Sequence, residues 1–546
     1  MRAATTTAAI LLAILAASLL GLGQIRASSA TYDEPVHLAA GYTDLVHGRY
    51  RLNAMDHPPL AEMWAALPLL ALRPNWFPAH PDWLGGRVYH YGDLFLYKNR
   101  ISAGRLLGAA RVWNLVTLTA LLACAVVLWA RRLEGASGAW GAAAALGLCV
   151  PWFSNASLVT TDALSAALFF VSCALLSAQR RTPPLWAAAG GAVGAALAAK
   201  FNMVLLPVLA GFAFAVEARA DRSRRPGPGD WALFAGAALL VLAAAYRFAF
   251  AGLYAQGLTA TLSRLSAGRP AYLHGSYSAS GWLWYFPVAL LVKTPLPLLL
   301  LGGLGAVSAL RRPRAQAAWL LAPPIGYFLA SLTSKTQIGY RHILPVYPFL
   351  CLWAGLGAAR LWNIGGKGRA VLAAAGLWLV IGVGRSSPYS LAYFNELVPA
   401  GRAHEWLADS NLDWGQDLPA LARELSARGG PAVVLSYFGS ADPAAYGIRF
   451  VPLGIISNVS RPGDASLPSG VPVLLAVSAT NLVGVYFKDH GLFSWLRERT
   501  PVADCGGSIF LYDLSADPDG RARLAGLLAA SGRPGDARVV AERKEP

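Results

Sequence analysis

The stretch VWNLVTLTALLACAVVLWA at residues 112–130 contains no charged residue, and Arg131 and Arg132 follow it directly. Its length is close to the ~20 residues that a helix needs to cross a bilayer. Apolar runs of this kind fall at about 6–24, 112–130, 138–153, 163–178, 185–199, 203–217, 230–246, 284–308, 317–332, 342–359 and 370–384. The chain is 55% hydrophobic and only 14% charged, whereas soluble proteins carry about 25% charge. The sequence therefore predicts an α-helical polytopic membrane protein with about eleven transmembrane helices.

Short basic clusters lie in every second connection between these runs. They are Arg2, Arg131-Arg132, Arg180-Arg181, Arg219 through Arg225, Arg311-Arg312-Arg314, and Arg360 through Arg369. Because Lys and Arg favour cytoplasmic loops, we expect a bacterial inner (plasma) membrane protein with a cytoplasmic N-terminus and the other connections in the periplasm. This topology explains the net charge of +17. No nucleic-acid motif is present, so we expect no nucleic-acid partner.

The first apolar run is open to two interpretations. It could be a cleavable signal peptide, because small residues follow it near position 30, or an uncleaved first helix, which we favour. Either interpretation sends the loop at about 25–111 out of the cytoplasm. That loop is too long for a simple connection, and its aromatic residues and prolines suggest helices along the membrane surface.

The sequence changes character after residue 384. Three short apolar segments, at 431–439, 472–478 and 508–514, are bounded by Gly and Pro and predict buried strands. Helices are predicted at 418–428 and 521–530. We therefore expect a membrane module at 1–384 and a soluble, external C-terminal α/β domain at 385–546.

The segment TYDEPVH at 31–37 follows the first span at the external boundary of the membrane. Adjacent carboxylates beside an apolar helix end cost desolvation energy unless they are solvated or paired. Asp33 and Glu34 could belong to a solvated loop that caps a helix. Alternatively, a carboxylate held where lipid head groups meet water could act as a base or bind a divalent cation, which is the one possible cofactor.

Two further acidic motifs are expected on the same side. Asp56 and His57 precede two prolines, whose fixed φ favours a helix start. Asp56 could cap that helix, or His57 could be a polar site residue beside Asp33. Asp162 stands at the external start of a span, where it could cap the helix and complement its dipole or face the same external cavity.

Several cations lie at the same level: Lys200 between two spans, Lys293 inside one, and Lys335 and Arg341-His342 around a short loop. A cation deep in a membrane helix costs roughly 2.5–3.5 kcal/mol and usually faces a cavity or a partner. Snorkelling is the alternative for Lys200. Cations at the external boundary suit a lipid phosphate or pyrophosphate. Since the sequence has no P-loop and no dinucleotide motif, a lipid-linked donor is expected.

The order of these motifs resembles that of the GT-C fold glycosyltransferases. It is similar to that of the dolichyl-phosphate-mannose protein mannosyltransferases and the bacterial lipid A aminoarabinose transferases. The motifs are YDE at 32–34, DHPPL at 56–60, TDA at 161–163, YRHILPVYP at 340–348, and Asn395-Glu396 followed by DSNLDWGQD at 409–417. Each motif is short, so the specificity lies in their order along most of the membrane region and the start of the tail.

The resemblance implies transfer of a sugar from a polyprenyl-phosphate donor to a protein, lipid or polysaccharide acceptor outside the cytoplasm, with inversion. Asp33 matches the family's acidic residue in the first external loop, which is assigned as the catalytic base or its equivalent. The resemblance thus implies that Asp33 is catalytic, with Glu34 beside it as a second catalytic residue that orients or supports it. Lys200, Lys335 and Arg341 fall in loops that would handle the lipid phosphate. We expect the polar residues Asp56, His57, Asp162 and His342 to contribute to donor or acceptor binding.

The implied chemistry is self-consistent. Polyprenyl phosphate is a good leaving group, so cations could stabilise its charge while one carboxylate takes the acceptor's proton. The alternative is a transporter or flippase of lipid-linked sugars, which would predict pseudo-repeats that the sequence does not show. A scaffold protein would not require the clustered charges. In the tail, Trp414 could bind sugar, or its segment could only open the helix at Leu418.

Overall fold

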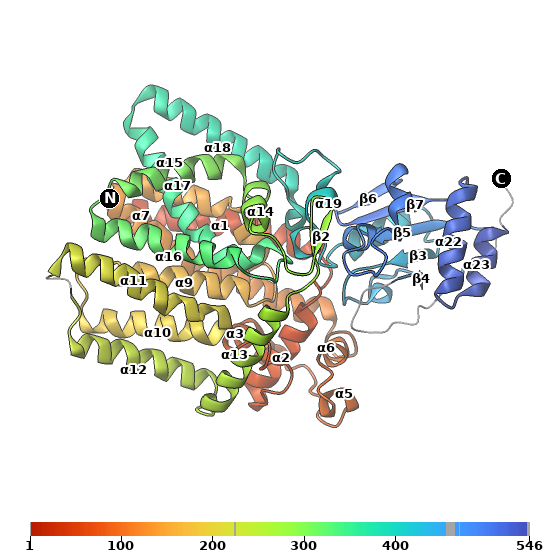
Figure 1. Ribbon diagram of the computed structural model, residues 1–546, viewed down its shortest axis with the longest axis horizontal. Coiled ribbons are helices and arrows are strands. Elements are labelled where there is room, and N and C mark those ends of the chain that lie inside the picture. The colour runs from red at the N-terminus through yellow and green to blue at the C-terminus, as the bar shows by residue number, and fades with distance from the viewer. Residues whose placement is uncertain (1, 223–224, 455–464, 469, 543–546) are drawn as a thin grey trace.

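The computed structural model describes residues 2–222, 225–454, 465–468 and 470–542. A helical body makes up most of the molecule, and a β-sheet with its own helices forms the C-terminal end (Figure 1). The N-terminus lies at the end of the body far from the sheet. The predicted combination of a helical part and a C-terminal α/β part is present, and the boundary at 384/385 stays a prediction.

The helices of the body coincide with the predicted apolar runs. They are α1 (Arg2–Ala27), α7 (Ala103–Gly147), α8 (Val150–Ala156), α9 (Asp162–Leu176), α10 (Pro183–Ala199), α11 (Leu205–Ala220), α12 (Pro228–Ala245), α14 (Tyr285–Lys293), α15 (Leu296–Leu310), α16 (Arg314–Leu332), α17 (Tyr347–Asn363) and α18 (Gly366–Ser386). Within the described residues, six helices are long and apolar enough to span a membrane, or seven if α14 and α15, which meet at 114°, form one broken span. These helices indicate a multi-pass membrane protein, and the count of about eleven spans stays a prediction.

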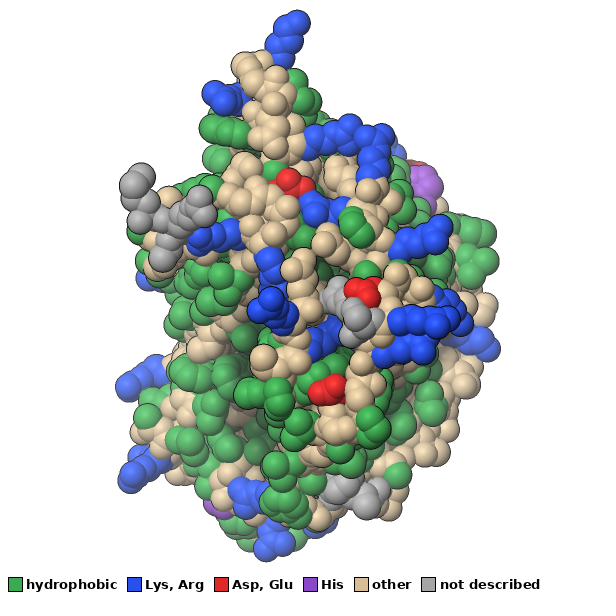
Figure 2. All heavy atoms as spheres, turned by 90° about the vertical axis from the view of Figure 1, so that its left-hand side faces the viewer, with side chains coloured by type: hydrophobic (Ala, Val, Ile, Leu, Met, Phe, Trp, Pro, Cys, Tyr) green, Lys and Arg blue, Asp and Glu red, His purple; other side chains and the backbone are tan. Residues whose placement is uncertain are grey.

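One end of the body is basic. The backbone of α7 leaves the helical conformation at Gly135, with φ 68°, just after Arg131 and Arg132. Two ion pairs join basic connections at this end: Arg312 with Glu134, and Arg181 with Glu217 at 2.5 Å. Figure 2 faces this end and shows many Lys and Arg side chains but few Asp or Glu. This distribution agrees with the predicted cytoplasmic side, although the orientation in a membrane stays a prediction.

Small residues let the helices of the body approach closely. A Cβ atom at Gly190 would lie 2.1 Å from the carbonyl oxygen of Phe234, and one at Gly194 would lie 2.2 Å from that of Ala238. Close backbone contact of this kind is typical of membrane helices. It fixes α10 against α12 and thereby the position of Lys200, which directly follows α10.

The first external loop folds into short helices. These are α2 (Glu34–His47), α3 (Leu60–Ala66), α4 (Leu69–Leu72), α5 (Pro81–Leu84) and α6 (Val88–Tyr97). Helix α2 is buried along most of its length and contacts α3 and α6. A Cβ at Gly41 would lie 2.1 Å from the Glu62 carbonyl oxygen, and one at Gly92 would lie 2.8 Å from the Pro35 backbone. The N-terminal end of α2, which follows Asp33, is therefore held in place.

The other external connections carry short elements. They are the 3₁₀ helices η1 (Phe201–Val204) and η3 (Tyr340–Val346), the helix α13 (Phe250–Ala267), and the strands β1 (Ala271–Leu273) and β2 (Ser276–Ser278). The two strands pair antiparallel, with Tyr272 opposite Tyr277.

The C-terminal sheet has five strands in the order β4-β3-β5-β7-β6. Its strands are β3 (Val433–Ser436), β4 (Phe450–Pro452), β5 (Leu474–Ser478), β6 (Ala503–Cys505) and β7 (Ile509–Asp513). Strand β3 runs parallel to β4 and β5, with Val434 opposite Val451 and Leu475, while β7 runs antiparallel to β5 and β6. The three predicted strands correspond to β3, β5 and β7.

The helices that accompany the sheet are mostly short. They are α19 (Ala403–Trp406), α20 (Leu418–Ala427), α21 (Ala479–Leu482), α22 (Pro518–Ala530) and α23 (Pro534–Ala541), with the 3₁₀ helices η4 (Ser390–Ala392), η5 (Asp409–Asn411), η6 (Pro443–Tyr446) and η7 (Ser494–Glu498). The two predicted helices correspond to α20 and α22.

The carboxyl ends of the parallel strands face the first external loop. Ser440, just after β3, donates through its hydroxyl to the Tyr32 carbonyl oxygen at 2.7 Å. Between sheet and loop lies the 409–417 segment: the Thr480 N–H donates to Asp413 at 2.9 Å, and the Tyr32 N–H donates to the Trp414 carbonyl at 2.9 Å. Ligands usually bind at the carboxyl ends of such strands. Here the chain's own segment fills that position and presents Trp414 to the helical body.

Candidate active site

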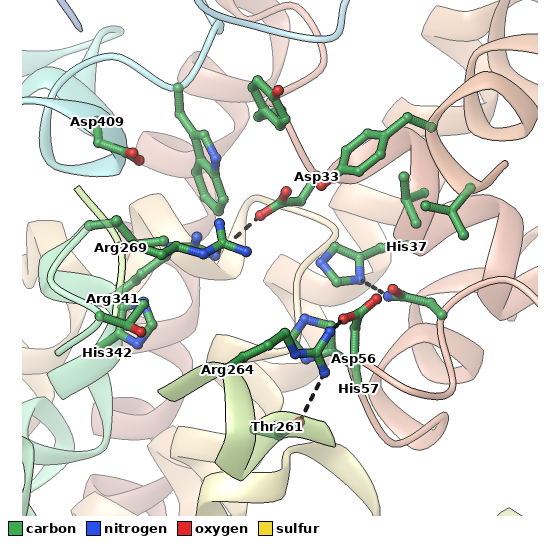
Figure 3. Close-up of a pocket in the computed structure, with 18 of the residues that line it drawn as sticks. Asp33, His37, Asp56, His57, Thr261, Arg264, Arg269, Arg341, His342 and Asp409 are labelled. Atoms are coloured by element: carbon green, nitrogen blue, oxygen red, sulfur yellow. Dashed lines mark hydrogen bonds and ion pairs between the residues drawn. The ribbon is translucent and has the colours of Figure 1, made fainter. Parts of the chain in front are cut away.

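A cavity of about 580 Å³ lies where the first loop, α13, η3 and the C-terminal part meet. Its charged and imidazole side chains come from all four and from the connection between α10 and η1. Figure 3 shows the labelled ones around a common space. The charged and imidazole residues are Asp33, His37, Asp56, His57, Lys200, Arg264, Arg269, Arg341, His342 and Asp409. Six of the nine predicted site residues are among them. Glu34, Asp162 and Lys335 are not.

Asp33 stands at the N-terminal end of α2, at the centre of the cavity (Figure 3). Its neighbour Tyr32 is held by the backbone of Trp414 and by Ser440. The Asp33 side chain is 25% exposed, and its Oδ2 lies 3.5 Å from Nη1 of Arg341. The structure therefore presents this carboxylate to the cavity beside a cation.

Arg341 and Lys200 share one carboxylate. Nη1 of Arg341 lies 3.5 Å from Oδ2 of Asp162, while Lys200 forms an ion pair with Oδ1 of the same residue. The guanidinium of Arg341 also lies 4.0 Å from the ring centroid of Trp414, and its Nε donates to Ser410 at 3.1 Å. Asp162 is the first residue of α9 and is 2% exposed. Asp162 therefore pairs with both predicted cations, Lys200 and Arg341, and fixes their positions at the cavity.

Glu34 is turned away from the cavity. It is fully buried and accepts hydrogen bonds from Arg111 Nε, the Val159 N–H and the Thr31 N–H, each at 2.8 Å. Burial opposes its charged form, but the charge and hydrogen bonds of Arg111 outweigh burial and hold the pKa of Glu34 below its ordinary value. Its catalytic role stays an untested prediction, and this geometry favours support of α2 instead.

Asp56 and His57 both line the cavity, but neither caps a helix. Helix α3 begins at Leu60 after Pro59, and Asp56 forms an ion pair with Arg264 of α13. His57 is packed beside His37, with ring centroids 5.1 Å apart. Burial, followed by the charges of His37 and Lys200, holds the pKa of His57 well below its ordinary value. His57 is therefore the neutral imidazole of this pair.

Of the three remaining basic residues, one lines the cavity and two lie outside it. His342 lines the cavity, and within the part of the chain that the structure describes its Nε2 has no hydrogen-bond partner. Lys335 is exposed and donates to the Ser266 carbonyl at 3.3 Å. Lys293 is buried elsewhere, where it donates to the carbonyls of Leu391 and Asn411 at 3.1 and 2.5 Å. It joins the bend between α14 and α15 to the tail.

Several cavity residues were not predicted as site residues from the sequence. Arg264 and Arg269 lie in the external loop at 247–283, where their charge was the only available signal. Asp409 adopts a left-handed φ of 55° and accepts a hydrogen bond from Tyr486. Burial raises the pKa of Asp409 above its ordinary value, although Tyr486 and Arg341 oppose that shift. Asp409 opens the DSNLDWGQD motif, but no local pattern indicates that it or Tyr486 reaches the membrane module.

Among the described residues, no group of three or more His, Cys, Asp or Glu side chains is placed to hold a metal ion. The divalent cation that the sequence leaves open stays a prediction.

No family model and no curated protein matches the sequence. The structure is similar to that of ArnT from Cupriavidus metallidurans in the apo state, with 14% identity, a TM-score of 0.49, and coverage of 93% of this chain and 98% of that chain. The same protein bound to undecaprenyl phosphate gives 14% identity, a TM-score of 0.46, and coverage of 94% and 97%. The Archaeoglobus fulgidus oligosaccharyltransferase in the apo form gives 12% identity, a TM-score of 0.43, and coverage of 70% of this chain and 54% of that chain.

These are GT-C fold glycosyltransferases, the group that the sequence motifs resemble.

Proposed function

We propose that this chain is a membrane glycosyltransferase. It moves a sugar from a polyprenyl-phosphate donor to a protein, lipid or polysaccharide acceptor at the external face of the membrane, with inversion at the anomeric carbon. The observation that supports this function is the cavity itself, in which the carboxylate of Asp33 and the cations Lys200 and Arg341 meet at the end of the membrane helices. The motif resemblance supplies the reaction class.

The cations form a phosphate-binding side. Arg341 and Lys200 bring two positive charges to the cavity, while Asp162 neutralises one of them. Arg269 adds positive charge from the segment after α13, whereas Arg264 of α13 is paired with Asp56. Fixed cations stabilise the charge that develops on a departing phosphate. Because Lys200 directly follows the apolar helix α10, a phosphate bound there would leave its prenyl chain in the bilayer.

Asp33 is the proposed base. It lies beside Arg341, so it would stand close to the donor's phosphate and sugar. In the reaction the acceptor oxygen forms a bond to the anomeric carbon, its proton passes to the Asp33 carboxylate, and the bond between that carbon and the phosphate oxygen breaks with its electron pair. A single displacement inverts the anomeric carbon. The leaving phosphate needs no protein acid, so one carboxylate is enough.

The alternative is a transporter or flippase of lipid-linked sugars. A flippase only moves a lipid between leaflets, so it does nothing measurable in detergent, where no leaflets exist. Purified protein should therefore be given undecaprenyl phosphate mannose, glucose and galactose separately, with a membrane extract as acceptor source. We expect release of undecaprenyl phosphate from at least one probe. Turnover of none of them, from protein that moves the same lipids across liposomes, would favour the flippase.

Phosphate binding can be tested with two matched cations. Arg341 faces the cavity, whereas Lys335 lies in the same loop but is exposed outside the cavity lining. We expect Arg341→Ala to weaken binding of undecaprenyl phosphate by at least tenfold, since a hydrogen bond to a charged group contributes about 1.5–3 kcal/mol. Arg341→Lys should also weaken it, because the bidentate fork is lost. Lys335→Ala is the control, and equal binding by Arg341→Ala and the parent would contradict the assignment.

A further inference from the structure

A buried carboxylate–imidazole pair stands behind Asp33. Oε1 of Glu62 lies 2.7 Å from Nδ1 of His37, and the two side chains are 1% and 4% exposed. The Asn53 amide donates to the same Glu62 oxygen at 2.5 Å. Glu62 belongs to α3 and His37 to α2, and the contact of Gly41 with the Glu62 backbone holds these helices together. This pair has no role in the reaction as proposed so far.

The contact with Glu62 determines which ring nitrogen of His37 carries the proton. An ionised carboxylate only accepts hydrogen bonds, so Nδ1 of His37 carries the proton that it donates to Glu62. The other nitrogen, Nε2, is then the basic atom. The His37 N–H donates to the Asp33 carbonyl at 3.1 Å, which places the two residues one helical turn apart. Both side chains point into the cavity (Figure 3).

We propose that His37, oriented by Glu62, is the proton relay of this site: it receives at Nε2 the proton that Asp33 removes from the acceptor hydroxyl. This inference rests on the proposed glycosyltransferase function. Among the described residues, no ion pair or hydrogen bond joins the side chains of Asp33 and His37, so the proton crosses through one water in the cavity. The O–H bond of protonated Asp33 breaks as that water takes the proton, the water gives up another of its protons, and an N–H bond forms on His37. The resulting imidazolium is paired with Glu62, and Asp33 regains its charge beside Arg341. The imidazolium then loses its proton to water in the cavity, so no other reactant is needed.

The electrostatics support this direction of transfer. Burial opposes a charged His37, but the hydrogen bond and charge of Glu62 outweigh it and raise the pKa of His37 above its ordinary value. An imidazole already binds a proton more tightly than a carboxylic acid does, with ordinary pKa values of about 6.5 and 3.9. The transfer of the proton from the carboxylic acid to the imidazole is therefore favourable.

The other charged groups around His37 agree with this assignment. Asp33 before α2 and Glu62 on α3 favour a charged His37, whereas Arg341 on η3 opposes it. The ring centroid of His57 lies 5.1 Å from that of His37, and His57 is close to Lys200. Within the part of the chain that the structure describes, no carboxylate forms an ion pair with His57 as Glu62 does with His37. A charge on one imidazole disfavours a charge on the adjacent imidazole by Coulombic repulsion. The proton is therefore assigned to His37.

The test is the pH dependence of turnover combined with a direct titration. The chain has nine histidines, few enough to follow by NMR with ¹³Cε1-labelled histidine in detergent. His37→Gln identifies the His37 signal by its loss. We expect Glu62→Gln to lower the titration midpoint of His37 by about one pH unit or more, because a charge at hydrogen-bond distance is removed. The acid limb of the kcat profile should move to lower pH by the same amount. In His37→Gln the limb that follows the titration of His37 should disappear, which leaves only a limb at lower pH from the base itself.

Two controls keep the test decisive. His80→Gln removes a partly exposed histidine of the same loop, and its kcat profile should match that of the parent. Glu62→Asp keeps the charge and should retain the acid limb. A change seen in Glu62→Gln but not in Glu62→Asp is therefore due to the lost charge and not to a loss of folding. An acid limb that does not move in folded Glu62→Gln, or that stays at the parental midpoint in His37→Gln, would overturn the relay. Either result with normal sugar transfer would leave the proposed function intact, whereas no transfer by the parent chain would overturn both.

Discussion

The pair formed by Glu34 and Arg111 shows how single residues support this site. Both side chains are at most 2% exposed, and Arg111 also donates to the carbonyls of Ser28 and Ser29. The arginine therefore connects the segment after α1 to the start of α2. Glu34 stands next to Asp33 in the sequence but contributes to its position and not to the cavity surface.

Removing that carboxylate should cost stability. We expect Glu34→Gln to lower the free energy of unfolding by about 3–5 kcal/mol, because it leaves a buried arginine uncompensated. The measurement is thermal unfolding in detergent, with the double variant Glu34→Gln/Arg111→Leu as the control that should recover part of the loss. Since the pKa of Glu34 is lowered on folding, its contribution is complete above its ordinary pKa of 4.5 and is lost as the pH falls through the folded value. An unchanged melting temperature would contradict this role.

At the residue scale, the sequence predicts those site residues that belong to short local motifs. Asp33 and Arg341 were identified because each belongs to a short motif at a predicted membrane boundary. The partners that decide their neighbours' roles are distant: Arg111 lies 77 positions after Glu34, and Glu62 lies 25 positions after His37. No periodicity or motif links such pairs, so the interpretation of Glu34 as catalytic could not be separated from a structural role before the fold was known.

At the scale of elements, the contact between α10 and α12 determines where a donor-binding cation stands. We expect Gly194→Ala to destabilise the protein by about 1–3 kcal/mol, since its Cβ would meet the Ala238 carbonyl at 2.2 Å and force the helices apart. The shift should also weaken undecaprenyl phosphate binding through Lys200. The matched control is Gly191→Ala, whose nearest neighbour is 3.7 Å away. Equal stability of the two variants would contradict the close packing.

Elements differ in how well the sequence predicts them. The apolar runs predicted their helices because burial in lipid or among helices is recorded along the whole segment. The strands β4 and β6 have three residues each, too short for such a pattern, and were missed. The predicted runs at 112–130 and 138–153 share the long kinked helix α7. Only Gly135 marks the turn between its two halves.

At the scale of the whole molecule, the basic connections and the cavity lie at opposite ends of the helical body. The basic connections gather at the end opposite the sheet (Figure 2), and the cavity lies at the other end, beside the C-terminal part. We expect an alkaline phosphatase fused after Arg225 to be inactive and one fused after Arg385 to be active, with fluorescent-protein fusions giving the reverse. The positive-inside rule supplies the reason. The same side for both fusions would contradict the predicted orientation.

The most direct test of the function is transfer by the Asp33→Asn variant. Asparagine keeps the size of aspartate but cannot take a proton, and loss of a general base costs roughly 10²–10⁴-fold in rate. Purified parent and variant should be compared for release of undecaprenyl phosphate from the probe that the parent uses, with undecaprenyl phosphate binding measured on the same samples. We predict turnover reduced at least a hundredfold, about the lower limit for a lost base, with donor binding little changed. Turnover at the parental rate would show that Asp33 is not the base and would contradict the proposed mechanism.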